Sequence, residues 1–415
     1  MLRSMISAAS ALRFHQTFMD VVANNIANVN TTAFKSGRVS FQEMMNQIIS
    51  SGTGPDLAAG RGGINPVQIG LGMTLGGVDT LFTQGGLQST GRTSDLAIQG
   101  EGFFIFQGSN NRLLYSRDGT LDIATDGRLV NPHTGLPILG WQADANGNID
   151  PTTPLTVITI GLGSTVTANP TSSVFFRGNL KSSAPTGADS QTRVTFEVYD
   201  SMGASHYITL TFEKTANNTW SITPSENDPD VVITSPPPAN LVFDAQGNVA
   251  SGGTPSLTIA LSNGATTPQT INLDLTSLTQ LADLSEVRAV SQDGNAAGAL
   301  IGFDVATSGI VMGVYSNGLR QAVGQIALAT FRNPAGLIKE GQNLYSESAN
   351  TGARTIGVAG TGERGQINAG YLEMSNVDLA TQFTDMIRAQ RGFQANSRVI
   401  SASDQMLQEL VNIVR

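Results

Sequence analysis

Residues 379–414 read LATQFTDMIRAQRGFQANSRVISASDQMLQELVNIV, and their apolar side chains recur with the three- and four-residue spacing of an amphipathic helix. This spacing draws one narrow stripe along the helix, made of Leu379, Phe383, Met386, Gln390, Phe393, Ser397, Ile400, Asp404, Leu407, Val411 and Val414. The preceding Ser375-Asn376-Val377-Asp378 matches a capping box in form. Gly392 is a weak point, because glycine costs a helix interior about 1 kcal/mol relative to alanine. The sequence therefore predicts one long helix here.

Residues 1–30 carry the same spacing, with a stripe made of Met5, Ala8, Leu12, His15, Met19, Val22, Ile26 and Val29. Narrow stripes suit packing of helix against helix, so we expect residues 1–30 and 372–415 to form one coiled-coil domain. The shorter helix can cover only part of the longer stripe, so the remainder is expected to pack on other copies. Until it does, we expect the terminal segments to be disordered in the monomer, and to become ordered in an assembly. The expected assembly interface consists of Met5, Leu12, Met19, Val22, Ile26, Leu379, Phe383, Met386, Phe393, Ile400 and Leu407.

The middle of the chain changes to short alternating runs such as Arg193–Tyr199, closed by turn dipeptides such as Asp118-Gly119 and Asn317-Gly318. This pattern predicts strands and hairpins, and therefore a mostly β protein with long terminal α-helices. We expect two nested β domains, with an outer one (151–290) inserted in an inner one (72–150 and 291–371). A connecting segment (31–71), which includes the glycine-rich stretch Ser50–Pro66, leads into them.

Composition excludes several classes of function. The 415 residues have a formal net charge of −9, which disfavours binding to nucleic acid, and no cysteine, which excludes disulfides and thiolate sites. No run of about 20 apolar residues occurs, so we predict no membrane insertion. Arg13, His15 and Asp20 interrupt any apolar core near the start, so no cleaved signal peptide is expected.

Catalytic patterns are weak throughout the sequence. His15, His133 and His206 are far apart and fit no metal-binding spacing, and no serine lies in a G-x-S-x-G motif. Residues 360–365 match G-x-G-x-x-G but lack the strand, helix and acidic residue of a dinucleotide site. We therefore expect no catalytic, cofactor or metal site. Helical ends that bind other copies without closing a ring favour a helical structural polymer, and a secreted β-rich enzyme or adhesin is the alternative from another class.

Specific motifs make the chain similar to the bacterial flagellar rod and hook family. At the N-terminal end residues 24–35 read NNIANVNTTAFK, and at the C-terminal end residues 375–379 and 386–396 read SNVDL and MIRAQRGFQAN. Between them, GEGFF (100–104) and YSRDG (115–119) resemble the β domain that the family shares, and VYDSMG (198–203) resembles the outer domain of its hook members.

The resemblance implies a non-enzymatic subunit of the flagellar hook, which polymerises into a curved tube and acts as a universal joint between rod and filament. It implies that the terminal helices line the tube and the β domains form outer layers. The implied partners are other copies, the rod and hook-filament junction proteins, the hook cap and the flagellar type III export apparatus, and the implied location is extracellular. A rod protein, which forms a straight shaft, is the alternative within the family.

Overall fold

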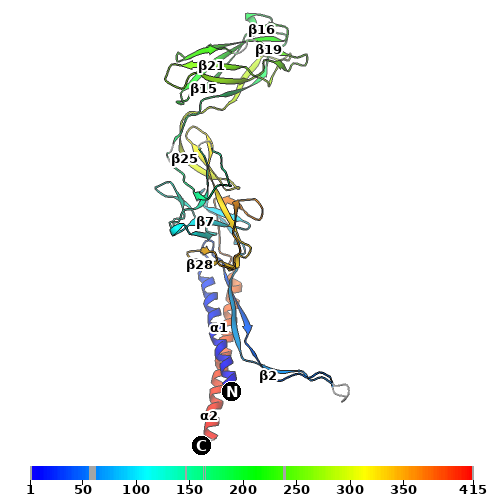
Figure 1. The fold of residues 1–415 in the computed structure, drawn as a ribbon, viewed down its shortest axis with the longest axis vertical. Helices are drawn as coiled ribbons and strands as arrows, with labels where there is room; N and C mark the ends of the chain where they lie inside the picture. Colours follow the sequence, from blue (N-terminus) through cyan, green and yellow to red (C-terminus); the bar gives the residue numbers. More distant parts are fainter. Residues whose placement is uncertain are drawn as a thin grey trace. The chain divides into compact units, whose positions relative to one another are not determined.

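The computed structural model describes residues 2–55, 62–144, 147–161, 163, 165–236 and 240–413 (Figure 1). Val414 and residues 56–61 of the Ser50–Pro66 stretch, both part of the sequence predictions, lie outside the described residues. The chain divides into two compact units. Unit 1 comprises Met1–Ile160, Asp304–Met312 and Ala322–Arg415, and unit 2 comprises Gly161–Phe303 and Gly313–Gln321.

Two long helices of unit 1, α1 (Leu2–Ala27) and α2 (Leu379–Ile413), pack side by side and run in opposite directions (Figure 1). The prediction of terminal helices that pair is confirmed. Because α2 has 35 residues and α1 has 26, α2 continues past the first turn of α1 by roughly 13 Å at 1.5 Å per residue. We call this uncovered end of α2 the overhang.

The start of α2 differs from the predicted capping box. The helix begins at Leu379, and its cap is Asp378, whose Oδ1 accepts a hydrogen bond from the backbone N–H of Ala380 at 3.0 Å. Ser375 instead accepts from the backbone N–H of Val377 and lies outside the helix. The prediction was wrong because an aspartate directly before the first turn provides the same acceptor, and its charge also favours the helix N-terminus.

The rest of unit 1 is built from strands, most of them in antiparallel pairs. The main sheet has the order β27-β7-β8-β29-β28, with β11 and β30 also paired to β27 and β12 to β11. Its strands are β7 (Phe103–Gln107), β8 (Leu113–Ser116), β11 (Leu139–Gln142), β12 (Thr156–Val157), β27 (Arg320–Thr330), β28 (Ile338–Gly341), β29 (Leu344–Ser346) and β30 (Thr355–Val358).

Five further strand pairs complete unit 1. They are β1 (Gly37–Glu43) with β4 (Met73–Thr80), β2 (Asn46–Ser50) with β3 (Val67–Gly70), β5 (Leu87–Ser89) with β32 (Tyr371–Glu373), β6 (Leu96–Gln99) with β31 (Gln366–Ala369), and β9 (Asp122–Ile123) with β10 (Leu129–Val130). Short 3₁₀ helices are η1 (Ser109–Asn111) and η3 (Pro334–Gly336).

The core of unit 1 is aromatic. Phe331 meets Tyr115 edge to face at 4.8 Å between ring centroids and lies 5.9 Å from Phe103. Trp141 is buried in the same cluster and donates from Nε1 to the carbonyl of Thr153 at 3.0 Å. These contacts hold the strands of the main sheet together in one buried core.

Unit 2 consists of two sheets that share one hydrophobic core. The first has the order β18-β21-β22-β14-β23 with β24 on the free side of β14, and the second has the order β15-β16-β17-β19-β20. Phe176 of the first sheet and Phe196 of the second meet edge to face at 5.3 Å between ring centroids. The strands of the first sheet are β14 (Ser173–Asn179), β18 (Val231–Ser235), β21 (Ser256–Leu261), β22 (Gln269–Asp274), β23 (Leu278–Thr279) and β24 (Glu286–Gln292).

The second sheet is made of β15 (Thr192–Tyr199), β16 (Ser205–Ala216), β17 (Thr219–Glu226), β19 (Asn240–Phe243) and β20 (Val249–Ser251), with the 3₁₀ helix η2 (Ala188–Ser190) before it. Strand β13 (Thr165–Val166) pairs with β25 (Gly298–Val305), and β26 is Ile310–Tyr315. The prediction of a mostly β chain with terminal helices is confirmed, whereas the nested arrangement and its boundaries stay predictions.

A buried histidine joins three loops of unit 2. The ring of His206 is 2.8 Å from Oδ2 of Asp228 through Nδ1 and 3.2 Å from Oδ2 of Asp200 through Nε2. Asp200 also accepts from Nδ2 of Asn263 at 2.5 Å. Burial alone lowers the pKa of His206, but the hydrogen bonds to the two carboxylates outweigh it and leave that pKa raised.

This arrangement predicts that unit 2 loses stability as the pH rises. Because the folded pKa of His206 lies above its unfolded value of about 6.5, the stabilisation is fully present below that value and disappears as the pH passes the folded pKa. The slope is at most about 1.4 kcal/mol per pH unit, which corresponds to one proton. Urea unfolding between pH 5 and 9, followed by Trp220 fluorescence in a Trp141→Phe background, measures it.

His206→Gln is expected to flatten this pH profile. His133→Gln is the control, because His133 lies on the surface of unit 1 and its loss should leave the profile unchanged. Parallel profiles for the wild type and His206→Gln would contradict the assignment of the charge to this ring.

Candidate assembly surface

The line along which α1 and α2 meet is made of small and polar side chains. A Cβ added to Gly392 would lie 2.5 Å from Cε1 of His15, so glycine lets the imidazole ring pack directly on the α2 backbone. Ten residues further along α1, Nδ2 of Asn25 donates to Oε1 of Gln382 at 2.9 Å. Ala389, the most buried side chain of α2, lies between these two contacts. The two helices therefore approach closely. Gly392 permits this approach, although helix propensity alone would count it only as unfavourable.

We expect Gly392→Ala to weaken the helix pair although alanine is the better helix former. The gain of about 1 kcal/mol in helix propensity is opposed by overpacking against His15, which costs about 1–3 kcal/mol. Hydrogen exchange of the α1 amides should become faster. In a His15→Ala background the same substitution should slow the exchange, and equal effects in both backgrounds would count against the contact.

A buried ion cluster lies where the helices meet the β-sheets of unit 1. Nζ of Lys35, just after α1, is 2.6 Å from Oε1 of Glu373, which ends β32 before α2, and both side chains are fully buried. Arg117 directly follows strand β8 of the main sheet, and its Nη1 is 3.4 Å from Oε2 of Glu373. Lys35 also donates to the carbonyl of Thr83 at 2.8 Å. We call Lys35, Glu373 and Arg117 the joint.

Backbone contacts surround the joint. Oδ1 of Asn376 accepts from the N–H of Ser36 at 2.8 Å, and its Nδ2 donates to the carbonyl of Leu81 at 2.8 Å. Ala33 is buried with φ of +58°, and its N–H donates to the carbonyl of Glu373 at 2.8 Å. The exit of α1, the segment after β4 and the entry to α2 are thereby tied at one point.

Burial dominates the electrostatics of the joint. It lowers the pKa of Lys35, and the neighbouring carboxylate of Glu373 counteracts part of that shift. Burial likewise lowers the pKa of Arg117, again opposed by Glu373, and the guanidinium also lies 5.4 Å from the ring centroid of Phe103. One carboxylate thus pairs with two buried cations, so its removal leaves both without their ion-pair partner.

The predicted assembly residues fall into two groups. Leu379, Phe383 and Phe393 are 40%, 51% and 37% exposed. The others are at least partly covered within the chain: Val22 is buried, and Met5, Leu12, Met19, Ile26, Met386, Ile400 and Leu407 are half-buried. The predicted α2 stripe is therefore only partly exposed.

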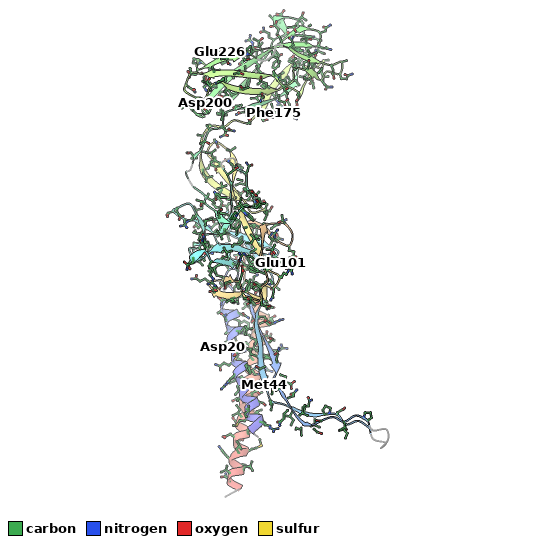
Figure 2. All side chains as sticks on the ribbon, in the orientation of Figure 1. Asp20, Met44, Glu101, Phe175, Asp200 and Glu226 are labelled. Atoms are coloured by element: carbon green, nitrogen blue, oxygen red, sulfur yellow. The ribbon has the colours of Figure 1, made fainter. Side chains whose placement is uncertain are left out.

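The structure adds an apolar surface that sequence reasoning missed. Strands β2 and β3 form a hairpin whose described side chains are all exposed, including Met45 before it at 76% and Ile64 at 66% (Figures 1 and 2; Met44 is labelled). We call residues 45–55 and 62–70 the arm. An isolated two-stranded hairpin is marginally stable in water, so the arm needs a surface to pack on. Val67 and Ile69, which alternate with Gln68, were the available signal, but the glycine-rich context masked them.

Metal, membrane-spanning and dinucleotide sites find little support in the described residues. No group of three metal-ligating side chains occurs in the part of the chain that the structure describes. Among those same residues, neither helix is both long and apolar enough to cross a bilayer. The G-x-G-x-x-G stretch is a loop followed by strand β31 rather than by a helix.

Paired terminal helices with uncovered apolar faces, tied to the β-sheets of unit 1 by a buried ion cluster, are typical of a structural protein that assembles with copies of itself. Four family models match successive parts of the chain. They are the flagella basal body rod protein (residues 5–35), the flagellar hook protein FlgE/F/G D1 domain (97–168), the flagellar basal body protein FlaE D2 domain (169–295) and the flagellar basal body rod FlgEFG protein C-terminal (368–413).

Full-length relatives agree with these models. The flagellar hook protein FlgE of Borreliella burgdorferi is 43% identical, and that of Treponema pallidum is 38% identical, each over 100% of both chains. The crystal structure of Helicobacter pylori flagellar hook protein FlgE2 has a similar fold, with a TM-score of 0.53 and 15% identity over 69% of this chain and 100% of that one. The chain belongs to the flagellar hook protein family. It is a structural subunit of the flagellar hook and not an enzyme, and the hook matches favour this over the rod alternative.

Proposed function

We propose that the chain polymerises into a curved helical tube that transmits torque from the flagellar rod to the filament as a universal joint. The observation that carries this proposal is the exposed apolar line on α2, which includes Leu379, Phe383 and Phe393 and which α1 leaves uncovered. Burial of each such side chain contributes about 1.5–3 kcal/mol, so neighbouring copies gain by covering them. The predicted interface residues that stay exposed or half-buried in the single chain enter this contact, and the arm adds a second one.

Rigid transmission needs a stiff connection between the helices and the β-sheets of the same subunit. The joint supports this role, because Glu373 holds both Lys35 and Arg117 where all side chains are buried. In this proposal torque enters through the helices and passes through the joint. Bending is taken up where β domains of neighbouring copies slide past one another.

The remaining features of the proposal come from the family. The outer β domain (151–290) is inserted in the inner one (72–150 and 291–371), and residues 31–71 connect it to the helices. The chain is extracellular after passage through the flagellar type III export apparatus. The ends of the polymer meet rod proteins on one side and hook-filament junction proteins on the other, with a hook cap during growth.

Electron microscopy of the purified full-length protein at high concentration tests the proposal. We expect curved tubes. Straight tubes would favour the rod alternative, and a protein that stays monomeric at all concentrations would contradict the polymer itself.

A further inference from the structure

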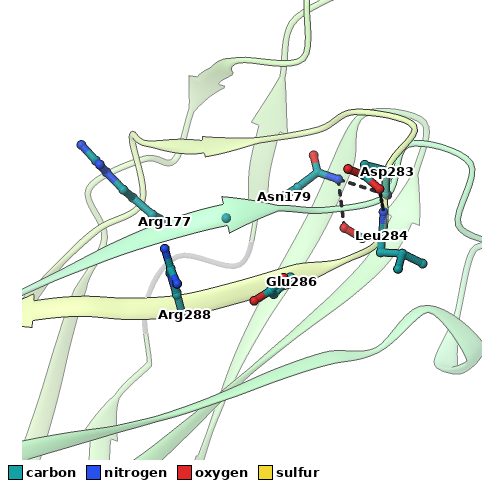
Figure 3. Close-up of a pocket in the computed structure, with 7 residues that line it drawn as sticks. Arg177, Asn179, Asp283, Leu284, Glu286 and Arg288 are labelled. Carbon is teal, nitrogen blue, oxygen red and sulfur yellow. Dashed lines mark hydrogen bonds between the residues drawn. The ribbon is translucent and has the colours of Figure 1, made fainter.

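Two arginines of unit 2 face each other, with no ion-pair partner among the residues that the structure describes. In the antiparallel pair of β14 and β24, Arg177 is the direct cross-strand partner of Arg288. Both are exposed and point to the same side of the strand pair (Figure 3). Neither makes an ion pair within the described residues, although Glu286 lines the same groove. Like charges directly opposite destabilise a sheet, so this pair is unfavourable in an isolated chain.

The surroundings of the pair have the composition of an interface. A groove of about 410 Å³ runs beside the arginines, and Gly178 forms part of it. A Cβ on Gly178 would lie 2.0 Å from the carbonyl oxygen of Glu286, so this position stays without a side chain. Leu284 is 75% exposed at the far wall, and Phe175 and Val290 are exposed beside the arginines. Arginine and aromatic residues next to apolar ones are enriched where proteins meet.

Hydrogen bonds with Asn179 order the segment that carries Leu284 in the single chain. Nδ2 of Asn179 donates to the carbonyls of Asp283 and Leu284 at 3.1 Å each, and its Oδ1 accepts from the N–H of Leu281 at 2.8 Å (Figure 3). A preformed surface loses little conformational freedom on binding. We call Arg177, Arg288 and Leu284 the arginine side of unit 2.

Two acidic residues lie at the opposite edge of the same sheet. Strand β18 forms that edge, at the other end of the strand order from β14 and β24. Glu226 ends β17 of the second sheet, and its Oε1 accepts from the backbone N–H of Ile233 of β18 at 2.7 Å. Asp230 directly precedes β18, and its Oδ1 accepts from Oγ of Ser262 at 3.0 Å. Both acids are exposed and make no ion pair within the described residues. Figure 2 labels Glu226 and Phe175, which lie well apart on unit 2. We call Glu226 and Asp230 the acidic side.

We propose that the arginine side of one copy binds the acidic side of unit 2 in the next copy. The charges are complementary, acidic residues outnumber basic ones in unit 2, and the two surfaces lie on opposite edges of one sheet. Contacts between opposite edges are head-to-tail, so they continue from copy to copy without closing a pair. This inference rests on the proposed polymer and names a contact within it.

Charge swaps in the full-length chain test the contact. Arg177→Glu with Arg288→Glu makes both sides acidic, and Glu226→Arg with Asp230→Arg makes both sides basic. Each double variant is expected to raise the concentration of unpolymerised protein by at least about tenfold, because like charges then meet at the contact. All four substitutions together restore complementarity with unchanged net charge, and this chain should polymerise nearly as the wild type does.

The outcomes separate this inference from the proposed function. A wild type that polymerises, with double variants equal to it at low salt, would overturn the contact alone. So would a fourfold variant that assembles no better than either double variant while its Trp220 fluorescence shows a folded unit 2. A wild type that never polymerises would overturn the proposed function and this contact with it.

Discussion

Replacing Phe393 by aspartate is expected to abolish tube formation while leaving both β units folded. The ring is 37% exposed in the folded chain, so a carboxylate there can reach water. In the polymer the same carboxylate would be buried against a neighbour without a cation, which costs several kcal/mol at every repeat of the contact. Sedimentation and electron microscopy measure the loss of polymer, and tryptophan fluorescence shows that the units remain folded.

Gln394→Asp is the matched control for this variant. It adds the same charge one position along the same helix, at an exposed polar residue outside the predicted stripe. We expect it to polymerise. Normal tubes from Phe393→Asp, or equal loss from both variants, would remove the apolar line of α2 from the interface.

Glu373→Gln is expected to destabilise unit 1 by about 3–5 kcal/mol, because it leaves Lys35 and Arg117 buried without their carboxylate. Glutamine keeps the shape and most hydrogen bonds of the side chain, so the change isolates the charge. Urea unfolding followed by Trp141 fluorescence in a Trp220→Phe background measures it, since Trp141 lies in the core of unit 1.

Asp122→Asn is the control for the joint. Asp122 pairs with Arg92 at 3.4 Å, but both side chains are 58% exposed, so its removal should leave the midpoint nearly unchanged. If Glu373→Gln shifted the midpoint no more than this control, the joint would not be the connection that stiffens unit 1.

The terminal helices could be predicted because their periodicity extends over many turns, and turn dipeptides with alternating strands revealed the β character. The face of contact could not be predicted in the same way. Periodicity places His15 in the stripe of the first helix, but in the second helix it selects Phe393 rather than the neighbouring Gly392, on which the ring of His15 packs. Small residues give no hydrophobic signal, although they permit the closest approach.

The joint could not be predicted from the sequence, for a different reason. Lys35 and Glu373 are separated by 338 positions, and no local pattern relates residues so far apart. Their neighbours offered an indirect signal, because Lys35 ends one family motif and Asn376 lies in another. Only the folded chain shows that the two motifs meet at one buried carboxylate.

The overhang of α2 has a consequence for growth. If each copy covers the overhang of its predecessor, as in the proposed polymer, it presents an identical one of its own, and the tip binds the next copy as readily after an addition as before it. The overhang itself then does not limit the number of copies. The final length of such a structure has to be imposed by another component or by the supply of subunits.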